Sequence, residues 1–191
     1  MMKLPQRLPN VLMLVLWVGI GWTVMTITHE LGHVAGGWLS GAHLTQLELS
    51  PWGLPFSIYH PDPYPLATLW AGPGLGCAIP LVGWLLMPHR CVAFVAAFCL
   101  IANGSYLLLG LVADGRELDT AKILAAGCPV WLVVLLASPV TLAGYIWIRS
   151  CSIAQLSPVL GLLSAGQIRS LGWTAFFWAT LMTIQWTLDR F

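Results

Sequence analysis

The sequence His-Glu-Leu-Gly-His, at residues 29–33, lies inside an apolar segment that runs from Val11 to Leu39. On an α-helix, side chains four positions apart lie on one face, so His29 and His33 can reach the same metal ion. The carboxylate of Glu30 projects beside that pair, where it can accept a proton from a water molecule at the metal. Ionisable groups within an apolar segment are costly and usually mark function. The pattern therefore predicts a metal site on a membrane helix, with Glu30 as its catalytic base.

The composition supports a membrane protein. Of the 191 residues, 58% are hydrophobic and only 8% are charged, whereas ordinary soluble domains carry about 25% charged residues. The 11 tryptophans are typical of the interfacial belts of membrane proteins. A formal net charge of +1 offers no basic surface. We therefore expect the lipid bilayer as a partner and exclude nucleic acid.

Several segments are long enough to cross a bilayer, since about 20 apolar residues span a core of about 30 Å. After the first segment, the predicted spans are Leu66–Met87, Cys91–Ala113, Pro129–Ile148 and Leu171–Leu188. Residues 150–170 are only mildly apolar, and a loop, an interfacial helix or a poor span all remain open for them. Between residues 40 and 65, polar and apolar residues alternate around a Pro/Gly turn, which predicts a short β-hairpin.

The predicted fold is thus a membrane all-α protein. We expect a polytopic bundle of four to six transmembrane helices, with a short β-hairpin after the first helix, forming one domain over residues 1–191. The exposed turns of that hairpin region include His43 and His60, which lack ligand spacing and are interpreted as surface residues.

Counting the crossings places residues 29–33 and the charged stretch from Asp114 to Lys122 at the same membrane face. The opposite face collects more basic residues, namely Lys3, Arg7, Arg90, Arg149 and Arg169. The positive-inside rule then puts that opposite face in the cytoplasm. From its small size and simplicity we expect a multi-pass protein of a bacterial inner (plasma) membrane.

Catalytic zinc keeps three protein ligands and an open position, so a third ligand is needed beside the two histidines. The acids that reach the same face are Asp119, Asp114, Glu117 and Glu48. Asp119 would also suit a helix N-cap, and Asp114 before Gly115 would also suit a turn. Periodicity does not choose between these candidates.

Small and polar residues in the predicted spans also need an explanation. Gly32 and Gly36 form a small-x-x-x-small pair that favours close helix packing. The stretch 71–76, Ala-Gly-Pro-Gly-Leu-Gly, either lets a neighbouring element approach or only kinks the second span. Asn103 lies mid-membrane in the third span. Because buried amides need partners, it either bonds a neighbouring helix or faces a wet cavity.

Over residues 26–129, the chain resembles the site-2 protease family of intramembrane zinc metalloproteases, in particular its small, core-only members. The resemblance rests on residues 29–33, the β-like stretch after them, Ala71-Gly-Pro73, and an aspartate after the third span. It implies one Zn²⁺ ion, held by His29, His33 and a later aspartate, with Glu30 as the general base.

The family pattern also bears on two further positions. The sequence from Asp119 to Pro129 is similar to the aspartate region of small members, whereas Asp114-Gly-Arg-Glu-Leu resembles that of others; we prefer Asp119 and keep Asp114 as the alternative. The resemblance implies a substrate-binding role for Asn103, although the usual Asn after Gly-Pro is missing and Asn103 lacks the Pro expected downstream.

The functional hypothesis is hydrolysis of peptide bonds in membrane-protein or peptide substrates by a zinc metalloendopeptidase. The alternative is a metal-binding membrane protein without proteolytic activity, acting as a regulator, chaperone or assembly factor.

Overall fold

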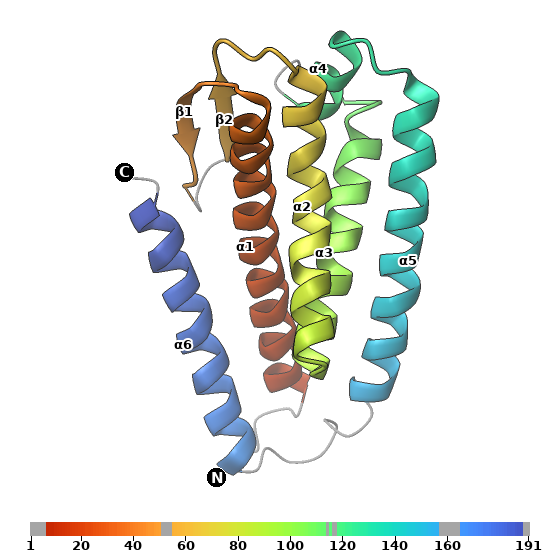
Figure 1. Ribbon diagram of the computed structural model, residues 1–191. Coiled ribbons are helices and arrows are strands. Elements are labelled where there is room, and N and C mark those ends of the chain that lie inside the picture. The colour runs from red at the N-terminus through yellow and green to blue at the C-terminus, as the bar shows by residue number, and fades with distance from the viewer. Residues whose placement is uncertain (1–6, 51–54, 114, 116–117, 157–164, 189–191) are drawn as a thin grey trace.

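The fold, seen in a computed structural model, is a helical bundle with a small hairpin at one end (Figure 1). The structure describes residues 7–50, 55–113, 115, 118–156 and 165–188. In chain order, the elements are α1 (Arg7–Ser40), β1 (Leu44–Glu48), β2 (Phe56–Tyr59), α2 (Pro65–Leu86), α3 (Arg90–Leu109), α4 (Asp119–Ala125), α5 (Val130–Leu156) and α6 (Ala165–Leu188). The prediction of a mainly helical bundle with a hairpin after the first helix is confirmed.

The long helices lie side by side, with α3 packed between α1 and α5 and α2 against both α1 and α3 (Figure 1). Helix α6 contacts the other side of α1. The hairpin and α4 lie together at the end of the bundle where α1 ends and α2 begins (Figure 1). The α2–α3 turn therefore lies at the opposite end of the bundle from the hairpin and α4, as the counting of crossings predicts (Figure 1).

Four helices are long and apolar enough to cross a membrane within the described part of the chain. They are Leu14–Ser40, Pro65–Leu86, Arg90–Leu109 and Val130–Ser150. Each coincides with a span predicted from the sequence. The mildly apolar stretch 150–170 is divided between the end of α5 and the start of α6, with residues 157–164 outside the described residues. The last predicted span lies in α6.

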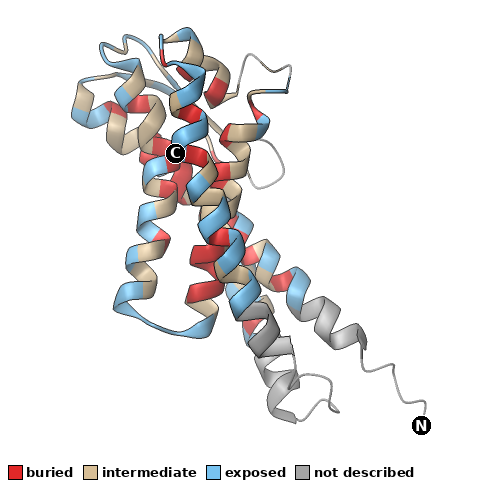
Figure 2. Cartoon of the chain, turned by 90° about the vertical axis from the view of Figure 1, so that its right-hand side faces the viewer, coloured by how far each residue is buried: buried red, intermediate tan, exposed pale blue. Residues whose placement is uncertain are grey.

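Polar and apolar side chains are distributed as in a bundle that faces lipid. Large apolar side chains such as Val18, Leu85 and Leu135 point outward and are exposed, while Thr23 and Asn103 are buried among the helices. Figure 2 shows exposed ribbon along the outer faces of the helices, with buried residues where the helices meet. Water would not favour such an outer surface, because monomeric soluble proteins rarely expose large contiguous apolar patches.

Helices α1 and α2 pack closely against one another, and glycine makes this contact possible. A Cβ atom added to Gly32 would lie 2.5 Å from the carbonyl oxygen of Ala71, and one added to Gly36 would overlap the Ala71 side chain. The helix-packing interpretation of this glycine pair is therefore confirmed. It brings α2 against the turn of α1 that carries residues 29–33.

The hairpin is a two-stranded antiparallel sheet in which Leu44 pairs with Tyr59 and Glu48 pairs with Phe56. Strand β2 contacts α1, so one strand of the hairpin lies along the helix that carries the predicted metal motif. His43, just before β1, and His60, just after β2, are exposed, as expected of surface residues.

Candidate metal centre

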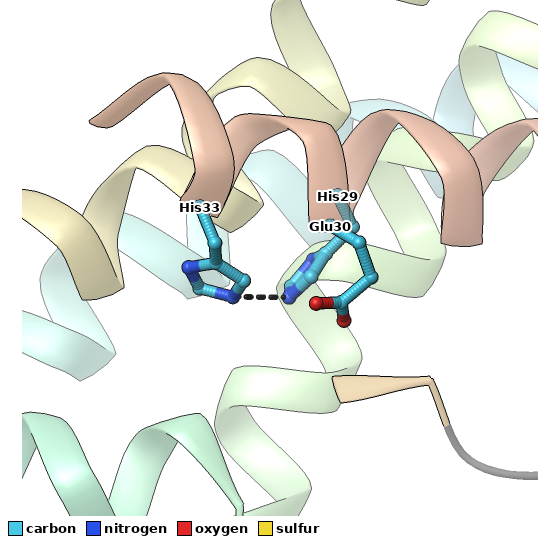
Figure 3. Close-up of side chains that lie close together, drawn as sticks. All are labelled: His29, Glu30 and His33. Carbon is cyan, nitrogen blue, oxygen red and sulfur yellow. Dashed lines mark hydrogen bonds between the residues drawn. The ribbon is translucent and has the colours of Figure 1, made fainter. Parts of the chain in front are cut away.

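The predicted metal motif is buried in the half of α1 nearer the hairpin. His29, Glu30 and His33 are only 6%, 4% and 4% exposed. Their ligand atoms lie within 4.8 Å of one another, so the three could hold a metal ion. Figure 3 shows both imidazole rings on one side of the helix, with the Glu30 carboxylate beside them. The Nε2 atoms of the two histidines are 3.1 Å apart.

Asp119 completes this group from the opposite side. Its Oδ2 atom lies 2.8 Å from Nε2 of His29 and 3.2 Å from Nε2 of His33. Asp119 is the first residue of α4, and Leu118 takes the N-cap position without a side-chain cap. The alternative role of Asp119 as N-cap is therefore wrong, since its carboxylate points to the histidines instead.

The other acids do not join the group in the part of the chain that the structure describes. Asp114 and Glu117 lie outside the described residues. Glu48 ends β1, and no described hydrogen bond or ion pair joins it to either imidazole. Asp119 is thus the aspartate that the fold brings to the two histidines.

Hydrogen bonds fix which ring nitrogens face the centre of the group. The carbonyl oxygen of Thr68 accepts a bond from Nδ1–H of His33, at 2.9 Å. The amide of Asn103 donates from Nδ2 to the Cys99 carbonyl, so its Oδ1 accepts from Nδ1–H of His29, at 2.6 Å. A neutral imidazole that donates from Nδ1 has a lone pair at Nε2. Both Nε2 lone pairs therefore point toward Oδ2 of Asp119.

Two such nitrogens and a carboxylate oxygen repel one another unless a cation or a proton lies between them. Their separations of 2.8 to 3.2 Å are close to the ~3.3 Å between ligand atoms around tetrahedral zinc, each ~2.0–2.2 Å from the metal. Two imidazoles and one carboxylate also form a donor set typical of catalytic zinc, which leaves one position open. The residues present fit a zinc ion.

The charge of Asp119 suits a ligand. Burial alone would raise the pKa of its carboxyl, but when the rings of His29 and His33 carry a proton toward it, their hydrogen bonds and charge hold that pKa well below its usual range. The carboxylate therefore stays ionised, as a metal ligand must be.

Glu30 is oriented by the hairpin. The hydroxyl of Ser57, in β2, donates a hydrogen bond of 2.9 Å to Oε2 of Glu30. Ser57 was not among the site residues predicted from the sequence, although the alternation of polar and apolar residues in β2 indicates that one face of the strand is polar. The missed contact of Thr68 uses a backbone carbonyl, which no sequence pattern reveals.

Asn103 is 1% exposed, and both ends of its amide are engaged inside the protein. Of the two alternatives left open for this residue, bonding to a neighbouring helix is the one that the structure shows. Its substrate-binding role stays a prediction. The structure shows that Asn103 forms a hydrogen bond to the candidate ligand His29. Such bonds orient the histidines that bind a metal ion.

The glycine-rich stretch of α2 makes room for the site. A Cβ atom on Gly72 would overlap the ring of His33, and one on Gly76 would lie 2.7 Å from Oδ1 of Asn103. A Cβ atom on Gly74 would meet nothing within 4 Å. Helix α2 continues through Pro73. Of the two interpretations of this stretch, close approach of a neighbouring element is therefore confirmed.

Comparison of the chain with protein-family models, with curated proteins and with solved structures gives no match.

Proposed function

We propose that the protein is an intramembrane zinc metalloprotease of the site-2 protease type, which hydrolyses peptide bonds of membrane-associated proteins or peptides. The supporting observation is the convergence of three lone-pair donors, from His29, His33 and Asp119, beside the carboxylate of Glu30. The resemblance of residues 26–129 to that family points to the same chemistry.

The side chains of the site would have three roles, which are metal binding, proton transfer and orientation of the base. His29, His33 and Asp119 would hold the zinc ion, which when bound would acidify a water molecule and polarise the peptide carbonyl. Glu30 accepts the proton of the attacking water and passes it to the leaving nitrogen. Ser57 keeps the Glu30 carboxylate beside the ligands through its hydrogen bond.

A bilayer location is part of the proposal. It is supported by four helices of sufficient length and apolar character and by the exposed apolar side chains along them. A bacterial inner membrane, with the basic face in the cytoplasm, fits the distribution of Lys and Arg.

The test separates metal binding from proteolysis. The wild-type protein, purified from membranes and reconstituted in lipid vesicles, should contain one zinc ion and cleave some members of a mixture of synthetic single-span peptides. Glu30→Gln should keep the zinc and lose cleavage by about 10²–10⁴-fold, the usual contribution of a general base. Undiminished cleavage by Glu30→Gln would refute the proposed mechanism. His33→Ala and Asp119→Ala should lose most of the zinc, whereas Asp114→Ala should keep it.

One observation favours a second candidate, a metal-binding membrane protein without proteolytic activity. The amide of Asn103 is buried and bonds to His29 and to the Cys99 carbonyl, so it serves the site from within and is not exposed to a substrate. Stoichiometric zinc in the wild type, together with no cleavage of any peptide in the mixture, would support this candidate over the protease.

A further inference from the structure

The aspartate that completes the candidate metal centre comes from a helix that is too short to be stable by itself. Helix α4 has only 7 residues, and isolated helices shorter than about 12–15 residues are marginal in water. The first N–H groups of any helix lack partners within it, and Leu118, at the N-cap of α4, provides no side-chain hydrogen bond. The place of the Asp119 carboxylate therefore depends on the neighbours of α4.

The end of α3 is one of these neighbours. The hydroxyl of Thr120 donates a hydrogen bond of 3.0 Å to the carbonyl oxygen of Leu107, and Ile123 is buried in one cluster with Leu107. A Cβ atom added to Gly110 would lie 2.5 Å from Oγ1 of Thr120, so α4 lies directly against the backbone that follows α3. These contacts begin at Thr120, and another group holds the first residue of α4.

That group is the side chain of Tyr106, near the end of α3. Its phenol oxygen accepts a hydrogen bond from the backbone N–H of Asp119, which has no acceptor within α4 because it is the first N–H of that helix. The ring of Tyr106 also meets the ring of His29 edge to face, with centroids 5.8 Å apart and an interplanar angle of 89°. Aromatic rings favour this arrangement. One side chain thus contacts two of the candidate ligands.

The spacing of residues in α3 explains how this helix serves both ligands. Asn103 and Tyr106 are three positions apart, so they lie on the same face of α3. Asn103 accepts the Nδ1 proton of His29, and Tyr106 bridges from the ring of His29 to the backbone of Asp119. Helix α3 packs against both α1 and α4. It therefore aligns the histidine motif with an aspartate that lies 90 positions later in the chain.

We propose that Tyr106 is a positioning residue of the metal centre, which holds the aspartate of α4 at the histidines of α1 before a metal ion binds. Ligands that are already in place bind an ion more tightly, because less freedom is lost on binding. Without the phenol oxygen, the start of α4 frays and the carboxylate of Asp119 leaves the two rings for part of the time. This inference rests on the metal-binding part of the proposed function and is independent of proteolysis.

The first test measures zinc affinity. Tyr106→Phe keeps the ring against His29 and removes only the oxygen that holds Asp119. The variant, reconstituted in lipid vesicles and stripped of metal, is titrated with zinc in competition with a chelator. We expect an affinity about 10-fold below that of the wild type, the low end of the usual effect of losing a contact that orients a ligand. Tyr145→Phe, which removes the same oxygen from an exposed residue of α5, is the matched control and should bind zinc like the wild type.

The second test needs no metal. In the metal-free protein, hydrogen exchange followed by mass spectrometry reports the opening of individual segments. We expect Tyr106→Phe to exchange several-fold faster at the start of α4 and to match the wild type in the long helices. Tyr145→Phe should match the wild type throughout. A side chain that only stabilised the bundle as a whole would change exchange in all helices alike.

The outcomes separate this inference from the function on which it rests. Wild-type zinc affinity in Tyr106→Phe would overturn the positioning role and leave the metal centre standing. A lower affinity with equally faster exchange in every helix would also overturn it, because the effect would then be one of general stability. Absence of zinc binding by the wild type would overturn the metal centre itself.

Discussion

Asn103 lies outside the metal-binding motif but sets the orientation of one of its histidines. Its Oδ1 accepts the Nδ1 proton of His29 and thereby directs the Nε2 lone pair of His29 toward His33 and Asp119. The orientation of the amide is itself fixed by its bond to the Cys99 carbonyl. Contacts of this kind set both the tautomer and the direction of a ligand ring.

At this scale, we predict that Asn103→Leu weakens zinc binding about 10- to 100-fold, the usual effect of losing such a contact. Asn103→Asp keeps an acceptor for His29 and should restore most of the affinity, which a purely packing role of this position would not explain. Affinities are measured by competition with a chelator of known zinc affinity. Ser105→Ala, which removes only a bond to the Ala102 carbonyl in the same helix, serves as control. Equal affinities of the Leu and Asp variants would contradict the prediction.

Among the elements, α2 is the one whose backbone shapes the site. Gly72 lies against the ring of His33, Gly76 lies against the amide of Asn103, and Gly74 between them faces open space. The three glycines follow one another at intervals of two residues in the same helix. Replacing each by Ala therefore makes the same chemical change in very different surroundings.

We expect Gly72→Ala to displace the imidazole of His33 and to lower the zinc content of the purified protein to a small fraction of one ion per chain. Gly74→Ala should leave the zinc content at one ion per chain. Metal analysis of both variants, with circular dichroism to confirm equal helix content, provides the measurement. If Gly72→Ala retained full zinc, the close approach of α2 would have no functional consequence.

At the scale of the whole molecule, the two ends of the bundle carry different elements. The hairpin, α4 and the candidate metal centre lie at one end, and the turn between α2 and α3 lies at the other (Figure 1). His60 is exposed at the first end and His89 at the second. Arg90, beside His89, belongs to the basic face that the positive-inside rule assigns to the cytoplasm.

This arrangement predicts the reactivity of single cysteines introduced into a cysteine-free background. A membrane-impermeant thiol reagent added to intact cells should label His60→Cys and leave His89→Cys unlabelled until the membrane is permeabilised. Labelling of both in intact cells would contradict a four-span bundle with its ends at opposite faces, and labelling of His89→Cys alone would reverse the orientation.

Local patterns in the chain were enough to locate the long helices and to find three residues of the candidate site. Apolar runs of about 20 residues define spans wherever they occur, and a four-residue spacing stacks two histidines on any helix. These are properties of neighbouring residues, so His29, Glu30 and His33 could be recognised without a fold. The hairpin followed in the same way from a period of two around a Pro/Gly turn.

The rest of the site depends on residues that are distant in sequence and that meet through packing. Asp119 lies 90 positions from His29, and periodicity alone left it one of four acids; the packing of α4 against α2 and α3 brings its carboxylate to the two rings. Ser57 reaches Glu30 because β2 lies along α1, and Thr68 acts through a backbone carbonyl that is the same in every residue type. Such contacts follow from the path of the chain in space, because the side chains that make them carry no local signal of their partners.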